Sequence, residues 1–200
     1  MRACGHSQEV AQDCTPRMRC SPSFPSGCGL LLHANWGDSL MSICAAIIIG
    51  AATFAPMKHT RVHLACDHAQ VVERVAHQHK IPAELVLAII WRESKWCPTC
   101  VNNTVGATGV MQVVPKWAKN KRLTHVTTNI KEGVRILLRW RRRAHARCRW
   151  ERRQGKRCNV WRRTLAGYSS GVSGLRDRNR GGRDYARTVS HLARRYKSKL

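Results

Sequence analysis

The clearest pattern in this chain is a helical spacing of apolar residues in its second half. Two stripes recur at intervals that suit one helix face: Ile130, Val134, Leu137 and Leu138, and then Tyr185, Val189, Leu192 and Tyr196. Strand-like alternation of apolar and polar residues does not compete with these patterns after residue 58. We therefore expect a mainly helical domain, with at most a small hairpin in the loop after Glu93.

Capping residues and prolines indicate where the helices begin. The expected starts are Asp67 with Gln70 as a capping box, Pro82 in a first turn, Pro115 before a short helix, Asn129 with Glu132 before a long one, Asn159, and Asp184 before the last. The helix that starts at Pro82 should end at Glu93, and the helix capped by Asn159 should lead to Tyr168. Loop-forming residues fill the interval 97–109.

The N-terminal quarter follows a different pattern. Residues 1–39 mix cysteine, proline, serine and glycine without a period, which is typical of a poorly structured leader. Residues 40–55 are an apolar run that is short for a membrane-spanning helix but suits a signal-peptide core. About forty residues precede it without a basic cluster, so either translation starts at Met41 or the run is an uncleaved anchor. We expect a leader at 1–39, a signal-like or anchor segment at 40–57 and a folded domain at 58–200.

Charge is distributed as unevenly as hydrophobicity. The net charge of the chain is +25, and the charges of residues 1–57 cancel, so the whole excess lies from Lys58 onward. Such a field favours polyanionic partners, namely nucleic acid, an anionic membrane or a cell wall that carries carboxylates and phosphates. It also fits a solvated cationic face that only keeps the protein soluble, and charge alone does not separate these possibilities.

Ten cysteines are many for a reduced cytosolic protein, and they indicate an oxidising compartment or a metal. Cys97 and Cys100 have the spacing of metal ligands, but a second half of a zinc site is missing because Cys148 and Cys158 are too far apart. Disulfides among Cys66 and these four are favoured instead if the domain is exported. Five is an odd number, so one thiol would be left over.

One acidic residue stands out as a candidate for chemistry. Glu93 ends the apolar stretch 85–91, and no further carboxylate follows until Glu132. A carboxyl group held in a partly apolar cleft has a raised pKa and can act as a general acid near neutral pH. The plainer interpretation is a helix-end glutamate that pairs with Arg92 or Lys95.

Several sequence blocks around and after Glu93 form a specific combination. They read W-R-E-S-K-W-C-P from Trp91, G-A-T-G-V-M-Q-V-V-P-K-W-A from Gly106, N-I-K-E-G-V-R-I-L-L from Asn129, L-A-G-Y-S-S-G from Leu165 and Y-A-R-T-V from Tyr185. In this order, over roughly residues 66–200, the chain resembles the catalytic domain of soluble lytic transglycosylases, the goose-type-lysozyme-like enzymes that cleave peptidoglycan. The resemblance implies a mainly α fold of the lysozyme-like α+β superfamily, a compact helical domain with a cleft.

The resemblance also implies the site. The family's acid corresponds to Glu93 and its adjacent serine to Ser94, while its substrate-groove residues correspond to Met111, Gln112 and Tyr168. The chain departs from the family pattern at Ser169, which stands where the family often has asparagine after the tyrosine. Neither a cofactor nor a metal is implied.

We expect distinct roles for these side chains. Ser94 would hydrogen-bond Glu93 and hold its rotamer, or bind the local backbone as serines at helix ends often do. Gln112 would bind sugar amide or hydroxyl groups, Met111 would form an apolar wall, and Tyr168 would stack or hydrogen-bond near the cleaved bond. Only one of these residues is a carboxylic acid, and the resemblance implies that the C6 hydroxyl of N-acetylmuramic acid serves as the nucleophile and closes a 1,6-anhydro ring.

Three other functions remain open at this stage. A hydrolytic muramidase on the same fold would need a second carboxylate, for which the candidates are Glu73, Glu84, Asp177 and Asp184. A nucleic-acid-binding protein would use the basic stretch 139–153 with Trp140 and Trp150, but it leaves the Glu93 and Gln112 blocks unexplained. A structural component that keeps the fold without catalysis is weakened by the intact acid.

The expected partners and location follow from the resemblance and the charge. Peptidoglycan glycan strands are the expected substrate, anionic wall polymers or a membrane surface are further contacts that the basic face allows, and nucleic acid is not expected. We expect an exported protein, periplasmic or associated with the cell envelope, with a virion or a plasmid-transfer apparatus as further settings.

Overall fold

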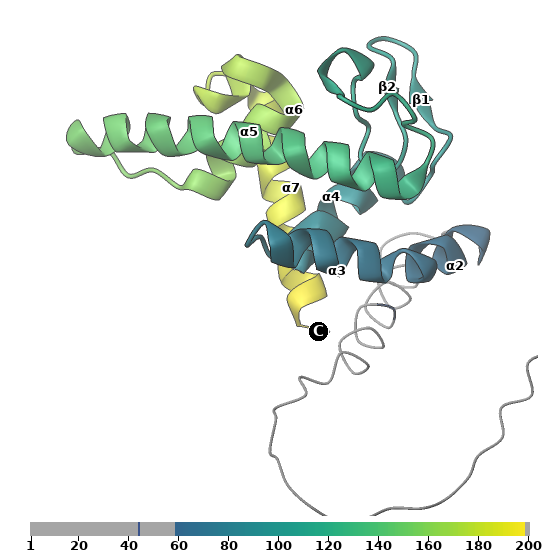
Figure 1. Cartoon of the computed structure of the whole chain (residues 1–200). Coiled ribbons are helices and arrows are strands. Elements are labelled where there is room, and N and C mark those ends of the chain that lie inside the picture. The colour runs from purple at the N-terminus through teal and green to yellow at the C-terminus, as the bar shows by residue number, and fades with distance from the viewer. Residues whose placement is uncertain (1–43, 45–58, 199–200) are drawn as a thin grey trace, which may run out of the picture. The chain divides into compact units, whose positions relative to one another are not determined.

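The computed structural model describes Cys44 and residues 59–198 (Figure 1). Its elements are α2 (His59–Asp67), α3 (Ala69–Gln78), α4 (Ala83–Ser94), β1 (Val101–Asn102), β2 (Ala107–Thr108), the 3₁₀ helix η1 (Pro115–Trp117), α5 (Val126–Arg153), α6 (Val160–Leu175) and α7 (Arg180–Lys197). The two strands pair antiparallel, with Val101 opposite Thr108. The described part of the chain is therefore mainly helical with one small hairpin, as the apolar spacing and the resemblance both predict.

Helix α4 forms the centre of the core. Every residue from Leu85 to Trp91 is buried, because this helix is apolar on all sides rather than along one stripe. Helix α7 packs against both α4 and α6, and α6 packs against α5 (Figure 1). The last helix of the chain therefore links α4, which carries Glu93, to α6, which carries Tyr168.

Both predicted apolar stripes face this core. Ile130, Val134 and Leu137 are fully buried on α5, and Leu138 packs partly buried against them. On α7, the whole predicted stripe is buried: Tyr185, Val189, Leu192 and Tyr196. The spacing of apolar residues thus identified the inward face of each helix correctly.

Three of the predicted helix starts are confirmed. Pro82 is the N-cap of α4, Pro115 opens η1, and the side chain of Asn159 caps α6 by accepting a hydrogen bond from Arg162 N. Helix α4 ends at Ser94, one residue beyond the predicted end at Glu93.

The other three starts were wrong. Asp67 is the last residue of α2 and α3 begins after His68, so the proposed capping box with Gln70 does not exist. Helix α7 begins at Arg180 with Asn179 as its cap, so Asp184 lies inside the helix instead of preceding it. Asp184 forms exposed ion pairs with Arg180 and Arg187.

The third error concerns α5, which begins at Val126 with His125 as its cap. Asn129 and Glu132, predicted as the cap, lie inside the helix and are buried. Both bind the backbone of the preceding loop instead: Glu132, for example, accepts hydrogen bonds from Lys119 N and Asn120 N. These side chains satisfy loop donors rather than helix-end donors, which a sequence pattern does not distinguish.

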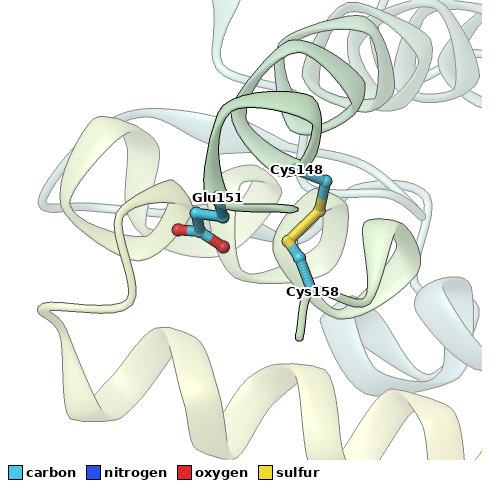
Figure 2. A group of neighbouring side chains, drawn as sticks. All are labelled: Cys148, Glu151 and Cys158. Atoms are coloured by element: carbon cyan, nitrogen blue, oxygen red, sulfur yellow. A yellow bond between two sulfur atoms is a disulfide. The ribbon is translucent and has the colours of Figure 1, made fainter. Parts of the chain in front are cut away.

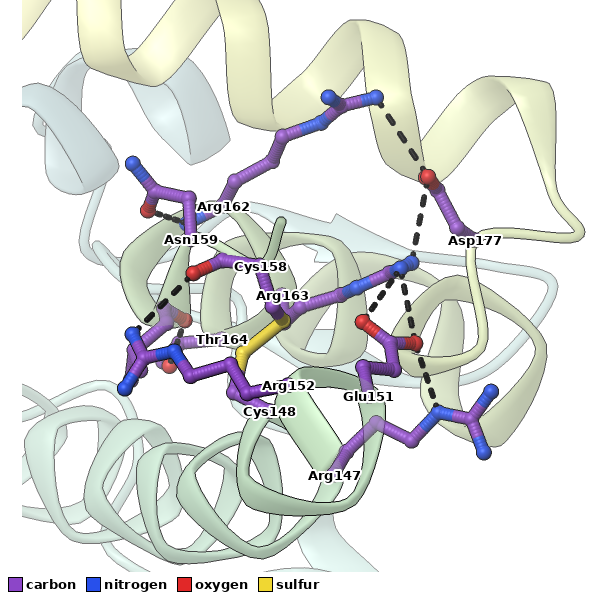
Figure 3. The surroundings of a disulfide bond; sticks show 11 residues. Arg147, Cys148, Glu151, Arg152, Cys158, Asn159, Arg162, Arg163, Thr164 and Asp177 are labelled. Carbon is purple, nitrogen blue, oxygen red and sulfur yellow. Dashed lines mark hydrogen bonds and ion pairs between the residues drawn. A yellow bond between two sulfur atoms is a disulfide. The ribbon is translucent and has the colours of Figure 1, made fainter. Parts of the chain in front are cut away.

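All six described cysteines form disulfides, which pair Cys44 with Cys66, Cys97 with Cys100 and Cys148 with Cys158. The expectation of a thiol left over was therefore wrong for these residues, because it omitted Cys44 as a partner for Cys66. Figure 3 shows the third disulfide, which closes the turn between α5 and α6. Beside it, buried Glu151 binds Arg147 and Arg163 at 2.8 and 3.0 Å.

The predictions for residues 1–39 and 40–57 lie outside the described residues, except at Cys44. Among the helices of the described part, none combines the length and the hydrophobicity that crossing a membrane requires.

Candidate active site

Glu93 occupies the last turn of α4, where the apolar helix meets a sharp reversal of the chain. The two residues after Ser94, Lys95 and Trp96, both have left-handed backbone angles, with φ of 50° and 61°. Such angles are costly for non-glycine residues. Trp96 is fully buried and anchors the reversal. The chain therefore leaves the helix abruptly, and Glu93 stays half-buried at its end.

The carboxyl group of Glu93 is bound by a tyrosine from the far end of the sequence. The hydroxyl of Tyr185 on α7 donates a hydrogen bond of 2.5 Å to Glu93 Oε1. The guanidinium of Arg92 lies over the ring of this tyrosine, 5.9 Å from its centroid. In the described part of the chain Glu93 thus hydrogen-bonds Tyr185 and does not form the ion pair with Arg92 or Lys95 that the plainer interpretation requires.

Burial raises the pKa of Glu93 above its ordinary value, since removal from water penalises the charged form. The hydrogen bond from Tyr185 and the positive charge of Arg92 lower this pKa in part, and the net change is upward. Burial and the nearby charge of Glu93 also raise the pKa of Tyr185 and of Tyr168 well above the usual range. Both phenols therefore keep their protons and remain hydrogen-bond donors.

Tyr168 joins α6 to the loop that follows the hairpin. Its hydroxyl donates to the carbonyl oxygen of Met111 at 2.9 Å, and the charge of Glu93 contributes to its pKa. Met111 itself is fully buried, and its side chain packs on Gly133 so closely that a Cβ there would lie 2.5 Å from the sulfur. The side chain of Met111 thus packs in the core, and its backbone carbonyl binds the tyrosine.

The same loop is held in place by Asn129, a buried residue of α5. Asn129 accepts a hydrogen bond from Met111 N at 2.7 Å and donates to the carbonyls of Thr108 and Leu123. Gly109 allows this contact because it has a φ of +82°, and a Cβ at this position would lie 2.3 Å from the Asn129 amide. This one amide side chain therefore fixes the position of Met111 relative to α5.

Ser94 and Gln112 bind backbone groups at the base of this loop. The Ser94 hydroxyl donates to Val110 O at 2.9 Å and accepts from Cys97 N. A hydroxyl has one proton to donate, so Ser94 acts here as the backbone binder and does not donate to Glu93. Gln112 Nε2 donates to Cys100 O and Gly109 O at 3.1 and 3.0 Å, so its carbonyl oxygen is the part of its amide that remains for a ligand.

Ser169 follows Tyr168 on α6 and is exposed. Its hydroxyl lies 3.4 Å from that of Ser170. Immediately afterwards the helix is interrupted, since Ser170 and Gly171 have non-helical backbone angles. The kink places Tyr168 and Ser169 at the end of the regular part of α6.

Tyr185 is the residue of the candidate site that sequence reasoning missed. It belonged to one of the sequence blocks and to the apolar stripe of α7, and was interpreted only as a core residue. The structure shows that it has both roles, with the ring buried in the core and the hydroxyl on Glu93. A tyrosine in a stripe of aliphatic residues is the available signal, because a buried phenol needs a polar partner.

The other candidate carboxylates have different surroundings. Asp177 pairs with Arg162 and Arg163, and Asp184 pairs with arginines of its own helix. Glu84 lies nine residues before Glu93 on α4, about 13 Å along the axis, and Glu73 belongs to α3. None of the causes that shift the pKa of Glu93 is a second carboxylate.

Neither cysteine cluster within residues 59–198 provides ligands for a metal. Cys97 and Cys100, the pair with ligand spacing, are joined in a disulfide. Cys148, Glu151 and Cys158 bring three ligand atoms within 4.8 Å of one another (Figure 2). However, the two sulfurs are bonded to each other, and the carboxylate is bound by arginines, so the group does not fit a cation.

The described residues form a helical domain with a short hairpin. In this domain one tyrosine binds a half-buried glutamate, and a second tyrosine lies near the same glutamate. Together these features define a lysozyme-like glycan-cleaving domain. Comparison with known protein families agrees. The chain belongs to the Transglycosylase SLT domain family, whose sequence profile matches residues 70–189. Membership implies peptidoglycan lytic transglycosylase activity in general, directed at glycan strands of the cell wall. Comparisons with curated proteins and with solved structures gave no match.

Proposed function

We propose that this protein cleaves the β-1,4 bond between N-acetylmuramic acid and N-acetylglucosamine without water and leaves 1,6-anhydro-muramic acid ends. Glu93 acts as the general acid and then as the general base. The observation that carries the proposal is the raised pKa of the Glu93 carboxyl group together with its hydrogen bond from Tyr185. A carboxyl group that keeps its proton near neutral pH is what the first step requires.

The hydrogen bond from Tyr185 determines which oxygen of Glu93 carries the proton. Because the phenol remains a donor, Oε1 serves as the acceptor, which leaves Oε2 to carry the proton whenever the carboxyl group is protonated. In the first step this proton passes to the glycosidic oxygen as its bond to C1 of the muramic acid breaks. The C6 hydroxyl oxygen then bonds to C1, and its proton returns to Glu93. Atoms balance without a water molecule.

The neighbouring residues support substrate binding in this proposal. Gln112 offers its carbonyl oxygen to a sugar N–H, because its N–H groups are bound to the loop backbone. Tyr168 fixes the carbonyl of Met111, and it lies close enough to Glu93 that the charge of Glu93 raises the pKa of Tyr168. Ser94 holds the loop, and exposed Ser169 is the group that would contact a sugar in place of an asparagine.

The proposal also accounts for the absence of a second carboxylate among the groups that shift the pKa of Glu93. Hydrolysis by the usual routes needs a second carboxylate within about 5 to 10 Å of the acid. Asp177, Asp184 and Glu84 are engaged elsewhere or distant along the helix. When the substrate's own hydroxyl is the nucleophile, no partner is needed, and the entropy cost of recruiting water is avoided.

The decisive experiment digests purified peptidoglycan in oxygen-18 water and measures product masses. We expect ends that are one water lighter than hydrolytic ends and that carry no heavy oxygen. Replacing Glu93→Gln should lower wall lysis by about two to four orders of magnitude. The matched control is Glu84→Gln on the same helix, which should retain activity. Reducing ends that carry oxygen-18 would show that water is the nucleophile, and the protein would then be a muramidase.

The cellular location forms part of the same proposal. Enzymes of this family act on the cell wall, and three disulfides in the described part of the chain fit an oxidising compartment. We therefore infer export to the cell envelope. Free-thiol counting on protein isolated from cells tests this, since a cytosolic protein would keep these thiols reduced.

A further inference from the structure

A cationic groove lies between the start of α6 and the outer face of α7. It has a volume of about 370 Å³, and its lining includes Arg162, Arg183, Arg187 and Arg194. No acidic side chain lines it. Figure 3 shows Asn159 and Arg162 on the α6 side. We call this surface the α6–α7 groove.

The groove residues from α7 form one stripe. Arg183, Arg187, Ser190 and Arg194 follow one another at i, i+4, i+7 and i+11, so they share a helix face over about 16 Å. At about 100° per residue this stripe is turned roughly half a revolution from Tyr185 and the buried core stripe. The groove is therefore separate from the Glu93 site, and its arginines are not part of the proposed reaction.

Several of these charges remain available. Arg194 is exposed and, within residues 59–198, forms no ion pair, while Arg183 donates to the backbone carbonyl of Asp177. Among the described residues, Arg187 pairs with half-buried Asp184 at 3.5 Å, and 79 % of the Arg187 side chain is accessible. A surface ion pair of this kind contributes little free energy and exchanges readily for a stronger anion.

An adjoining hollow extends the cationic surface. Arg152, Gly155, Lys156, Arg157 and Cys158 line it at the turn between α5 and α6. The disulfide of Cys158 with Cys148 and the buried Glu151 network hold this turn in place (Figure 3). Cys158 of this hollow and Asn159 of the α6–α7 groove are consecutive residues, so the two hollows are neighbours along the chain. The disulfide and the ion pairs of Glu151 hold the chain at this point.

We propose that the α6–α7 groove binds the phosphate groups of a phosphodiester polymer attached to the cell wall and so holds the enzyme at its substrate. Guanidinium groups bind phosphate oxygens in a bidentate manner, and a linear array of them suits a repeating polyanion. This inference rests on the proposed function for the choice of polymer, because it assumes that the protein works at the wall.

Nucleic acid fits the groove less well. Single strands are bound through aromatic rings on which bases stack. The one aromatic residue that lines the groove, Trp161, is half-buried and already covered by Arg141, which lies 4.7 Å from the ring centroid. Trp140 and Trp150 of α5 are covered in the same way by Arg143 and Arg147. Trp140 and Trp150 do not line the groove, so within the groove binding rests mainly on phosphates.

A membrane surface also fits less well. Interfacial binding needs exposed apolar side chains that enter the lipid. The exposed large apolar residues of the described part are Val101, Val105, Trp117, Trp150 and Val172, and none of them lines the groove. A concave, arginine-lined surface is suited to a narrow polymer rather than to a flat bilayer.

The test measures binding of fluorescent poly(glycerol phosphate) to the full chain at several salt concentrations. The double variant Arg187→Gln/Arg194→Gln should bind about tenfold more weakly at about 0.1 M salt, with the slope of log affinity against log salt reduced by about 1 to 2. The matched control, Arg74→Gln/Arg122→Gln, removes the same charge from exposed positions that line neither hollow and should change affinity less than twofold.

Three results would overturn the proposal: no binding of the polymer to the wild type, equal losses in both double variants, or equally tight binding of oligothymidylate that the groove variant abolishes. The first two would show that the groove is not a site, and the third would make it a nucleic-acid site. Polymer binding is measured without turnover, and Glu93→Gln should retain it. Failure here is therefore distinguishable from failure of the proposed reaction.

Discussion

At the scale of single residues, Tyr185 both packs in the core and orients the carboxyl group of Glu93. The ring of Tyr185 belongs to the core, and its hydroxyl is fixed 2.5 Å from the carboxyl group. The phenol cannot move without disturbing the packing of α7 on α4. The acid therefore has one preferred orientation before any substrate binds.

We predict that Tyr185→Phe shifts the pH dependence of catalysis. The hydrogen bond from Tyr185 lowers the pKa of Glu93, so its removal raises that pKa further. A general acid must be protonated, and activity falls as pH rises through its pKa. The basic limb of the profile of kcat/KM should therefore move to higher pH, while maximal activity falls about tenfold because the carboxyl group is less well oriented. The measurement is wall lysis across pH.

The control for this variant is Tyr196→Phe, which removes a hydroxyl from the same buried stripe away from Glu93. It should leave the pH profile in place. A purely structural role for Tyr185 would lower stability and activity in Tyr185→Phe without moving the basic limb.

We also predict that Glu93→Gln is at least as stable as the wild type at neutral pH. Burial raises the folded-state pKa of Glu93, so the folded state binds this proton more tightly than the unfolded state. The associated stability is present at acidic pH and is lost as pH rises through the folded-state pKa. Glutamine does not ionise, so the stability of the variant relative to the wild type should rise over that pH range. Urea unfolding at about pH 4 and pH 8 checks the sign.

The sequence predicted some of these residues and not others for physical reasons. Glu93 was predicted as the acid because a lone carboxylate at the end of an apolar helix combines with the sequence blocks around it, and that role stays a prediction. Asn129 was interpreted as a cap because asparagine is common there. Its actual role depends on Met111 and Leu123, which approach it only in the folded chain.

At the scale of elements, the basic half of α5 has two kinds of arginine. Arg139, Arg141 and Arg143 lie over the rings of Trp117, Trp161 and Trp140, at 5.2, 4.7 and 4.9 Å from their centroids. Arg142 is exposed between them. The sequence showed this region only as a basic stretch, residues 139–153, since the spacing of arginines does not reveal which indole each one covers.

This difference gives a prediction for the basic helix. On peptidoglycan freed of phosphodiester polymers, Arg142→Gln/Arg149→Gln should weaken binding in a salt-dependent way, because both exposed charges attract the wall's carboxylates. Stability and turnover of short soluble glycans should stay nearly unchanged. Loss of turnover on short glycans in this folded variant would place these arginines in the active site.

The arginines that cover indoles should behave differently. Arg141→Gln should lower the free energy of unfolding by about 0.5 to 2 kcal/mol, because it removes a cation–π contact with the half-buried ring of Trp161. Urea unfolding measures this loss, and Arg142→Gln, which covers no ring, is the matched control. Equal stability of the two variants would contradict the distinction.

At the scale of the whole molecule, apolar periodicity was enough for the mainly helical class, and the combination of sequence blocks was enough for the family. The contacts between segments that lie far apart in the sequence could not be predicted from these patterns. Disulfide pairing depends on which sulfurs meet in three dimensions, and the apolar run that contains Cys44 was interpreted only as a signal or anchor. The bond between Cys44 and Cys66 requires both residues to reach the same oxidising compartment.

The last prediction concerns that bond. Cys44 and Cys66 are separated by 22 positions, so a cut between them cannot release the N-terminal piece until the disulfide is reduced. Trypsin, which cleaves after Lys58 and Arg61, should yield the Cys44 and Cys66 peptides as one species without reductant and as two with it. Closing a loop of this length should stabilise the fold by about 3 kcal/mol, which Cys66→Ser should lose. Alkylation of Cys66 in unreduced protein would contradict the pairing and restore the single leftover thiol that the cysteine count suggested.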